Sequence, residues 1–284
     1  MDCARFWIHQ DFAGHMAQRT QRVGYTSHSM HQILAISRYT LLEARRARLP
    51  LLFAVALSAV LALSFFASEL AVIESSRIQT TIFGAGIRLT AVFIIAVHVI
   101  ASVAREFDDK GLDMLLALDL PRAHYILGKL GGFLAAGAVM SLAACMPLLL
   151  MGPAMAALQW GLVLGLELAV VIAFALFCVV AFGQFMPSAA VVLAFYLLAR
   201  SITAMRLMSA NPLTGADTLS HEVSRWLIEG LALLLPALDR WPQTAWLTDE
   251  PAAWHGVFAL LLEALLYVTL LAGAAMVDFH RRNF

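Results

Sequence analysis

The chain has 284 residues, of which 61% are hydrophobic and only 13% are charged. Soluble domains are about 45–50% apolar and about 25% charged, so this composition excludes a soluble enzyme, a nucleic-acid-binding protein and a disordered regulator. The 19 basic and 19 acidic residues cancel, which argues against a polyanion such as nucleic acid as the main partner.

The N-terminal part of the chain divides into a polar stretch and an amphipathic one. Residues 1–29 are polar and lack the apolar core of a cleavable signal peptide, so we expect a disordered extension. Residues 30–48 carry apolar side chains roughly on one face and arginines at the C-terminal end. They predict an amphipathic elbow helix on an anionic inner leaflet, although a simple positive-inside anchor explains the arginines equally well.

Six apolar runs are long enough to cross a bilayer, which takes about 20 mainly apolar residues. They are Pro50–Ile73, Ile82–Ala104, Tyr125–Met151, Leu158–Gly183, Met186–Met205 and Trp254–Val277. A seventh run, Leu227–Leu238, is too short to span and predicts a re-entrant or interfacial helix within the connection of residues 206–253. The sequence thus predicts an all-α integral membrane protein whose six transmembrane helices lie in one domain, residues 30–284.

The distribution of basic residues predicts the orientation of the spans. Thirteen of the 19 lie before the first span, between the second and third, or after the last: Arg5, Arg19, Arg22, Arg38, Arg45, Arg46, Arg48, Arg105, Lys110, Arg122, Lys129, Arg281 and Arg282. With six spans these three segments share one side of the membrane. We therefore expect both termini to be cytoplasmic and residues 206–253 to be external.

Residues 105–130 are unusual for a cytoplasmic connection, which needs only a few polar turn residues. A cluster of charges is followed by a leucine-rich helical turn, and Pro121 then ends the helix. The pattern predicts a short helix over about 106–120, parallel to the membrane, with an apolar knob and a charged rim. Such a knob suits docking to a soluble partner, but the leucines could instead pack under the bundle.

The segment resembles the signature of type-2 ABC exporter permeases. The matching residues are Arg105, Glu106, Gly111, Leu112, Leu115, Leu116, Pro121, Arg122, Gly128 and Lys129. Residues 38–50 are similar to the elbow of permeases from the branch associated with multicopper-enzyme maturation. The chain departs from the usual pattern in having leucine rather than threonine at 112 and a longer spacing between Leu116 and Pro121.

The resemblance implies that the segment is a coupling helix seated in a cleft of a separate ATPase subunit. The implied rim charges are Arg105, Glu106, Asp108, Asp109 and Lys110; the implied buried contact comes from Leu112, Leu115 and Leu116; and Pro121 and Arg122 complete the motif. The resemblance further implies two ATPase copies, a second permease copy in a homodimer, and the inner membrane of a bacterium.

The chain has no GxxxxGK[ST] run, so ATP and Mg are expected on the partner subunit and the chain itself is not expected to be an enzyme. Its three cysteines, Cys3, Cys145 and Cys178, have no metal-ligand spacing. We therefore expect neither a metal nor a cofactor in this chain.

Charged residues inside the spans are candidates for the translocation path. A charge at the bilayer centre costs about 2.5–3.5 kcal/mol, so Glu167 should face protein or water. It is either a substrate-path group or a carboxyl bonded to a neighbouring helix. Arg200 and Glu263 raise the same question, and Arg200 could pair with either glutamate. Arg88, six residues into the second span, is expected to snorkel to the outer surface.

Gly128 with Gly132 and Gly161 with Gly165 have the spacing that lets two helices approach closely, and we expect them to pack within the chain.

Three other functions remain alternatives. A stand-alone secondary transporter should show broken helices or paired midplane charges, and it leaves the 105–130 segment unexplained. An intramembrane enzyme needs a constellation such as HExxH, which does not occur in the chain. A non-transporting membrane scaffold is the third alternative.

Overall fold

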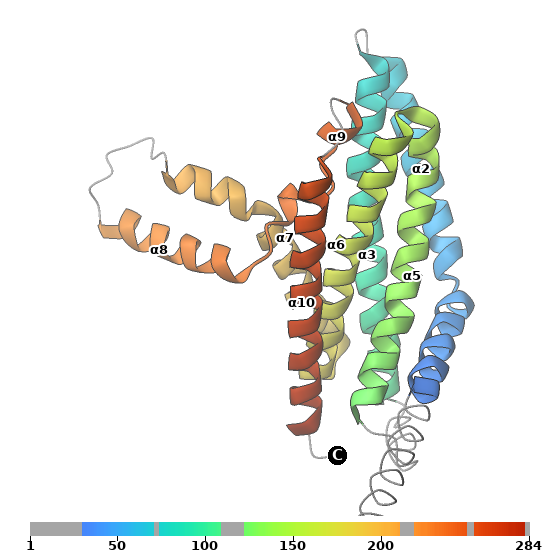
Figure 1. Ribbon diagram of the computed structural model, residues 1–284, viewed down its shortest axis with the longest axis vertical. Helices are drawn as coiled ribbons and strands as arrows, with labels where there is room; N and C mark the ends of the chain where they lie inside the picture. Colours follow the sequence, from blue (N-terminus) through green and yellow to red (C-terminus); the bar gives the residue numbers. More distant parts are fainter. Residues whose placement is uncertain (1–29, 71–73, 109–121, 211–218, 249–252, 282–284) are drawn as a thin grey trace, which may run out of the picture.

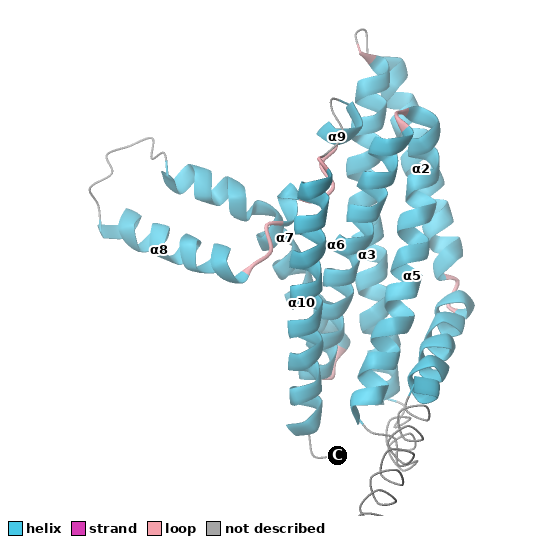
Figure 2. Ribbon diagram, in the orientation of Figure 1, coloured by secondary structure: helices cyan, strands magenta, loops and turns pink. Residues whose placement is uncertain are grey.

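The computed structural model describes residues 30–70, 74–108, 122–210, 219–248 and 253–281. The helices are α2 (Leu49–Leu70), α3 (Ser75–Asp108), α5 (Arg122–Met151), α6 (Ala154–Phe182), α7 (Phe185–Ala210), α8 (Leu219–Leu234), the 3₁₀ turn η1 (Leu238–Arg240), α9 (Ala245–Thr248) and α10 (Trp254–Arg281). Residues 30–46 are also helical, and we call them the elbow helix. Within these ranges there is no strand (Figure 2).

Six of the helices, α2, α3, α5, α6, α7 and α10, are long and apolar enough to cross a membrane. They correspond to the six runs predicted from the sequence. The largest difference is at α3, which begins at Ser75 rather than near Ile82. Its 34 residues give a length of about 51 Å, longer than the roughly 30 Å hydrocarbon core, so α3 extends beyond the core.

Helix α6 is the centre of the bundle. In its most apolar window 72% of the residues are buried, against 17% for both α2 and α10. It packs against α3, α5, α7 and α10, while α2 packs mainly on α3. Other helices thus surround α6, whereas α2 and α10 leave apolar side chains exposed for lipid.

The elbow helix lies beside the N-terminal end of α5 (Figure 1). A Cβ atom on Gly128 would meet Ile36 at 2.6 Å, and one on Gly132 would meet Thr40 at 2.5 Å. These two glycines therefore form a close contact between helices, as their spacing predicts. The second pair makes a similar contact with α5, since a Cβ atom on Gly161 would lie 2.9 Å from Cys145.

The stretch before the last span is a longer helix than the sequence predicts. Helix α8 runs from Leu219 to Leu234, and with the C-terminal part of α7 it forms a hairpin that projects sideways from the bundle (Figure 1). The chain then returns through η1 and α9, which pack on the bundle. The predicted extension of residues 1–29 and most of the predicted coupling helix lie outside the described residues.

Candidate functional site

A polar cluster surrounds Lys129 at the end of the bundle where α5 begins. Although Lys129 is the eighth residue of α5, its side chain is only 2% exposed. Its ammonium group donates to Glu43 of the elbow helix at 3.1 Å and to Glu106 near the end of α3. One cation thus joins three segments. We call this set, with Ser102 and Tyr125, the Lys129 cluster.

The other members of the cluster satisfy the two carboxylates. Ser102 Oγ of α3 donates to Glu43 Oε1 at 2.7 Å, and the hydroxyl of Tyr125 donates to Glu106. The ring of Tyr125 stacks on Phe279, with centroids 5.8 Å apart, so the C-terminal end of α10 also joins the cluster. The Lys129 ammonium lies 5.7 Å from the ring centroid of Phe133, a cation–π distance.

Two carboxylates share one ammonium in the Lys129 cluster. Burial by itself raises the pKa of Glu43. The hydrogen bond from Ser102 and the charge and hydrogen bond of Lys129 together outweigh that effect, so the pKa lies below the ordinary value of 4.5. Glu43 is therefore ionised at neutral pH, and its charge depends on Lys129 for compensation. The arrangement is a structural tie, because its donors and acceptors are already paired with one another.

The cluster joins the two flanks of residues 109–121. Glu106 lies three residues before that segment, and Tyr125 and Lys129 follow it closely. Among the predicted rim residues, Arg105 and Asp108 are exposed, whereas Glu106 is partly buried and directed into the cluster. The Arg105 Nε donates to the carbonyl of Ala101 in its own helix.

The other residues of the predicted coupling segment lie outside the described part of the chain or at the start of α5. Asp109, Lys110, Leu112, Leu115, Leu116 and Pro121 lie outside the described residues, and Arg122 is the first residue of α5. Sequence reasoning missed the involvement of Glu43 and Ser102, which lie far from the segment in sequence. It also counted Lys129 as a basic residue of the cytoplasmic connection, whereas its side chain is buried.

A second polar site joins α3 and α6 inside the bundle. Arg88 donates from Nε to Glu167 Oε2 at 2.7 Å and from Nη2 to Glu167 Oε1 at 2.9 Å. The two side chains are 4% and 0% exposed. Arg88 also donates to the backbone carbonyls of Leu238, in η1, and of Pro242, two residues after η1. The same guanidinium therefore bonds to α6 and to this part of the connection before α10.

The expectation that Arg88 snorkels to the outer surface is wrong. The helix begins seven residues earlier than predicted, so Arg88 is the fourteenth residue of α3 and its side chain turns inward to a buried carboxylate. The alternative in which Glu167 pairs with Arg200 is also not realised, because both oxygens of Glu167 accept from Arg88.

Arg200 and Glu263 are not paired with each other among the ion pairs of the described residues. The Nη1 atom of Arg200 on α7 is buried without a hydrogen-bond partner in that part of the chain, and Glu263 is half-buried on α10. Tyr196, one turn before Arg200, is buried within electrostatic range of the Arg88–Glu167 pair. Tyr196 and Arg200 therefore lie on the α7 side of that pair, and they complete no catalytic or ligand set among the described residues.

The described residues contain no group of three histidine, cysteine or acidic side chains that could hold a metal ion. No family model matches the sequence, and no curated protein matches it either. What the helices do show is the class of protein. This chain is a multi-pass membrane protein, with six candidate spans in the part that the structure describes.

Proposed function

We propose that the chain is the membrane subunit of an ATP-driven ABC transporter, an exporter that provides the translocation path and couples to a separate ATPase subunit. The coupling segment is 105–122, as its resemblance to type-2 exporter permeases implies. In this proposal the partner binds ATP and Mg, the permease is not catalytic, and two permeases pair with two ATPases. The complex lies in a bacterial inner membrane with both permease termini in the cytoplasm.

The observation that carries this proposal is the Lys129 cluster. A docked segment transmits force to the spans only if its two ends are firmly joined to them. Glu106 before the segment and Lys129 after it are bonded to each other, and both are tied to the elbow helix through Glu43. A push on residues 109–121 would therefore move α3, α5 and the elbow helix together, which is the rigid-body rocking that alternating access requires.

The leucines of the segment supply the docking contact in this proposal. Leu112, Leu115 and Leu116 lie in a connection flanked by charges, where exposed apolar groups favour a protein partner. The charges of Arg105 and Asp108, both exposed, remain available for the rim of that contact. Glu106 acts on the permease side instead, as a positioning residue for the segment.

The test is co-purification from the native host. The tagged wild-type chain should retain a protein with a GxxxxGK[ST] run, together with vanadate-sensitive ATP hydrolysis. The double variant Leu115→Asp and Leu116→Asp should insert in the membrane yet lose both. The matched control is Leu115→Met with Leu116→Met, which keeps the apolar contact and should retain both. Wild-type retention by the aspartate variant contradicts the proposal.

A stand-alone secondary transporter is the second candidate, and the Arg88–Glu167 pair favours it because intramembrane ion pairs occur in ion-coupled carriers. The same purification separates the two. Such a carrier yields no stoichiometric ATPase in any variant. A non-transporting scaffold also yields no ATPase activity, and it tolerates loss of the Arg88–Glu167 pair provided that the bundle folds.

A further inference from the structure

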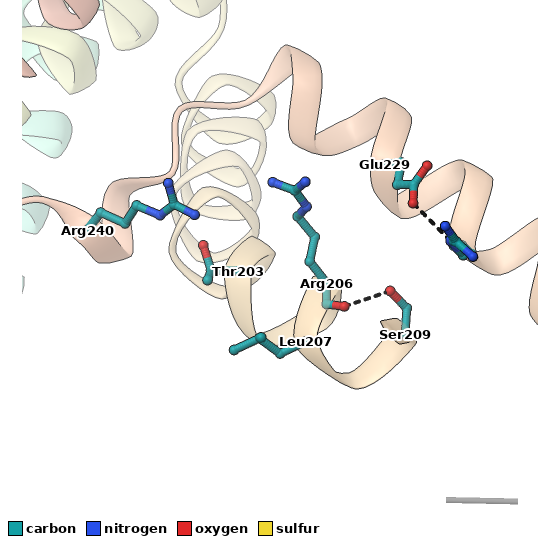
Figure 3. A pocket seen from close by; sticks show the side chains of 7 residues that line it. Thr203, Arg206, Leu207, Ser209, Glu229 and Arg240 are labelled. Atoms are coloured by element: carbon teal, nitrogen blue, oxygen red, sulfur yellow. Dashed lines mark hydrogen bonds and ion pairs between the residues drawn. The ribbon is translucent and has the colours of Figure 1, made fainter. Parts of the chain in front are cut away.

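A polar pocket lies between α7, α8 and η1, outside both sites described above (Figure 3). Its volume is about 410 Å³, within the roughly 300–1,000 Å³ of small-ligand sites. The lining side chains are Thr203, Arg206, Leu207, Ser209, Arg225, Glu229 and Arg240. Three arginines from three separate elements thus meet around one cavity.

Arginines outnumber carboxylates among the side chains that line this pocket. Arg225 is paired with Glu229 at 3.0 Å, which leaves Arg206 and Arg240 as an excess of two positive charges in the lining. Figure 3 shows their guanidinium groups directed toward the same space. Two carboxylates outside the lining offset part of this positive charge: Asp239, which accepts a hydrogen bond from Thr203, and Glu263 of α10, whose charge acts on Arg240. Two like charges held close together favour a bound anion.

The hydroxyl groups of the pocket are not free to donate to a ligand. Thr203 donates to Asp239 at 2.9 Å, and Ser209 donates to the backbone carbonyl of Arg206 at 2.9 Å. A ligand must therefore accept hydrogen bonds from guanidinium groups alone. Planar forks of N–H donors suit oxyanions such as phosphate, which accept two parallel bonds from one arginine.

The surroundings of the pocket are those of a membrane interface. On α8, Glu222, Arg225 and Glu229 follow one another at helical spacing, while Trp226, Leu227, Leu233 and Leu234 are exposed. Met208 at the end of α7 is also exposed. The hairpin runs across the bundle axis (Figure 1), which is the orientation that amphipathic interfacial helices take along a membrane surface.

We propose that this pocket binds the phosphate group of an anionic phospholipid. Arg206 and Arg240 hold the phosphate oxygens, and the acyl chains extend along the exposed apolar side chains of the hairpin. Two guanidinium groups can hold a lipid phosphate bidentately, as arginines hold other phosphates. The backbone at Arg240 is held in place by its neighbours. Leu238 and Trp241 are fully buried, and Arg88 donates a hydrogen bond to the Leu238 carbonyl. This proposal does not depend on an ATPase partner.

The test measures binding of phosphatidylglycerol to the purified full chain in detergent micelles. Arg206→Gln with Arg240→Gln should weaken binding at least about tenfold, because both charged donors are lost. The matched control is Arg77→Gln with Arg281→Gln, which removes two exposed arginines elsewhere and should bind as the wild type does. Arg206→Lys keeps the charge but loses the fork, and it should give an intermediate affinity.

Equal affinity in the two double variants would overturn the proposal. Millimolar inorganic phosphate is the second arm of the test. Failure to displace phosphatidylglycerol supports the lipid as the source, whereas full displacement identifies free phosphate as the ligand and overturns the lipid assignment. The unfolding temperatures of all variants are compared first. If the double variant Arg206→Gln with Arg240→Gln is unfolded, the single variant Arg206→Lys replaces it. A lower affinity for phosphatidylglycerol than in the wild type then supports the proposal, and wild-type affinity overturns it.

Discussion

Both carboxylate oxygens of Glu167 accept hydrogen bonds from Arg88, although the two residues are 79 positions apart in the chain. The pair fastens α3 to the central helix α6 in a region with almost no exposure. Breaking a buried pair by removing one partner costs about 3–5 kcal/mol, because the remaining charge stays buried. During any transport cycle α3 and α6 are therefore expected to move as one unit.

Arg88→Met and Glu167→Gln should each lower the free energy of unfolding, by about 3–5 kcal/mol for the first because it strands the Glu167 carboxylate. The double variant Arg88→Met with Glu167→Leu should recover much of the loss, since no buried charge remains. Recovery should be incomplete, because the carbonyls of Leu238 and Pro242 also lose their donor. Unfolding in detergent micelles measures all three. Wild-type stability in Arg88→Met would contradict the importance of the pair.

The sequence left open whether Glu167 faces a substrate path or bonds to a neighbouring helix, and it did not predict Arg88 as the partner. The cost of an isolated charge in lipid requires protein or water around the carboxyl, and α6 offers no second ionisable group to pair with it. Arg88 was assigned to the surface because the span was started at Ile82, seven residues late. The packing of η1 on Arg88 is a tertiary contact, and such contacts leave no periodic pattern in the sequence. The Arg88–Glu167 site could therefore not be predicted from the sequence.

The spans themselves were predicted well because each is a long apolar run, a signal that does not depend on neighbours. Residues 30–46 are helical, as the apolar face of residues 30–48 predicts, while their position on a membrane surface stays a prediction. The sequence did not predict the Lys129 cluster. Glu106 and Lys129 were identified as motif residues, but Glu43 and Ser102 enter through packing of the elbow helix on α5.

Lys129→Met should loosen the elbow helix, because it leaves Glu43 and Glu106 facing each other without the shared cation. The distance between spin labels at the exposed positions His31 and His280 should become broader than in the wild type. The control is Arg105→Met, which removes a nearby exposed cation that donates to the Ala101 carbonyl of its own helix, and it should leave the distance unchanged. A narrow wild-type distribution in Lys129→Met would show that the cluster does not hold the elbow helix.

Low pH should have a similar effect through Glu43. Its pKa is lowered in the folded protein, so its stabilisation is fully present above the ordinary value of 4.5 and is lost as the pH falls through the lower folded value. The spin-label distance should therefore stay constant from about pH 7 to about pH 5 and broaden at more acidic pH. Glu43→Gln should remove this transition. A transition of the same size in both proteins would assign it to another group.

Gly132→Ala should also displace the elbow helix, since the new Cβ would lie 2.5 Å from Thr40 and 2.8 Å from the carbonyl of Ser37. The matched control is Gly273→Ala on α10, where nothing lies within 4 Å of the new Cβ. Alanine favours helix by about 1 kcal/mol over glycine, so the control should be neutral or slightly stabilising. Opposite signs of the change in unfolding temperature are expected, and equal gains would contradict the close contact.

The last prediction concerns the orientation of the bundle. The elbow helix and the C-terminal end of α10 lie at one end, and α9 lies at the other (Figure 1). Because most basic residues outside the spans belong to the elbow end and its neighbouring connection, that end should be cytoplasmic. In a chain whose three cysteines are replaced, an impermeant maleimide should label Ser220→Cys and Gln243→Cys in intact cells. It should reach Asp109→Cys and His280→Cys only after the membrane is permeabilised. Labelling of all four positions from the same side would overturn the six-span topology, and exchange of the two pairs would reverse the orientation.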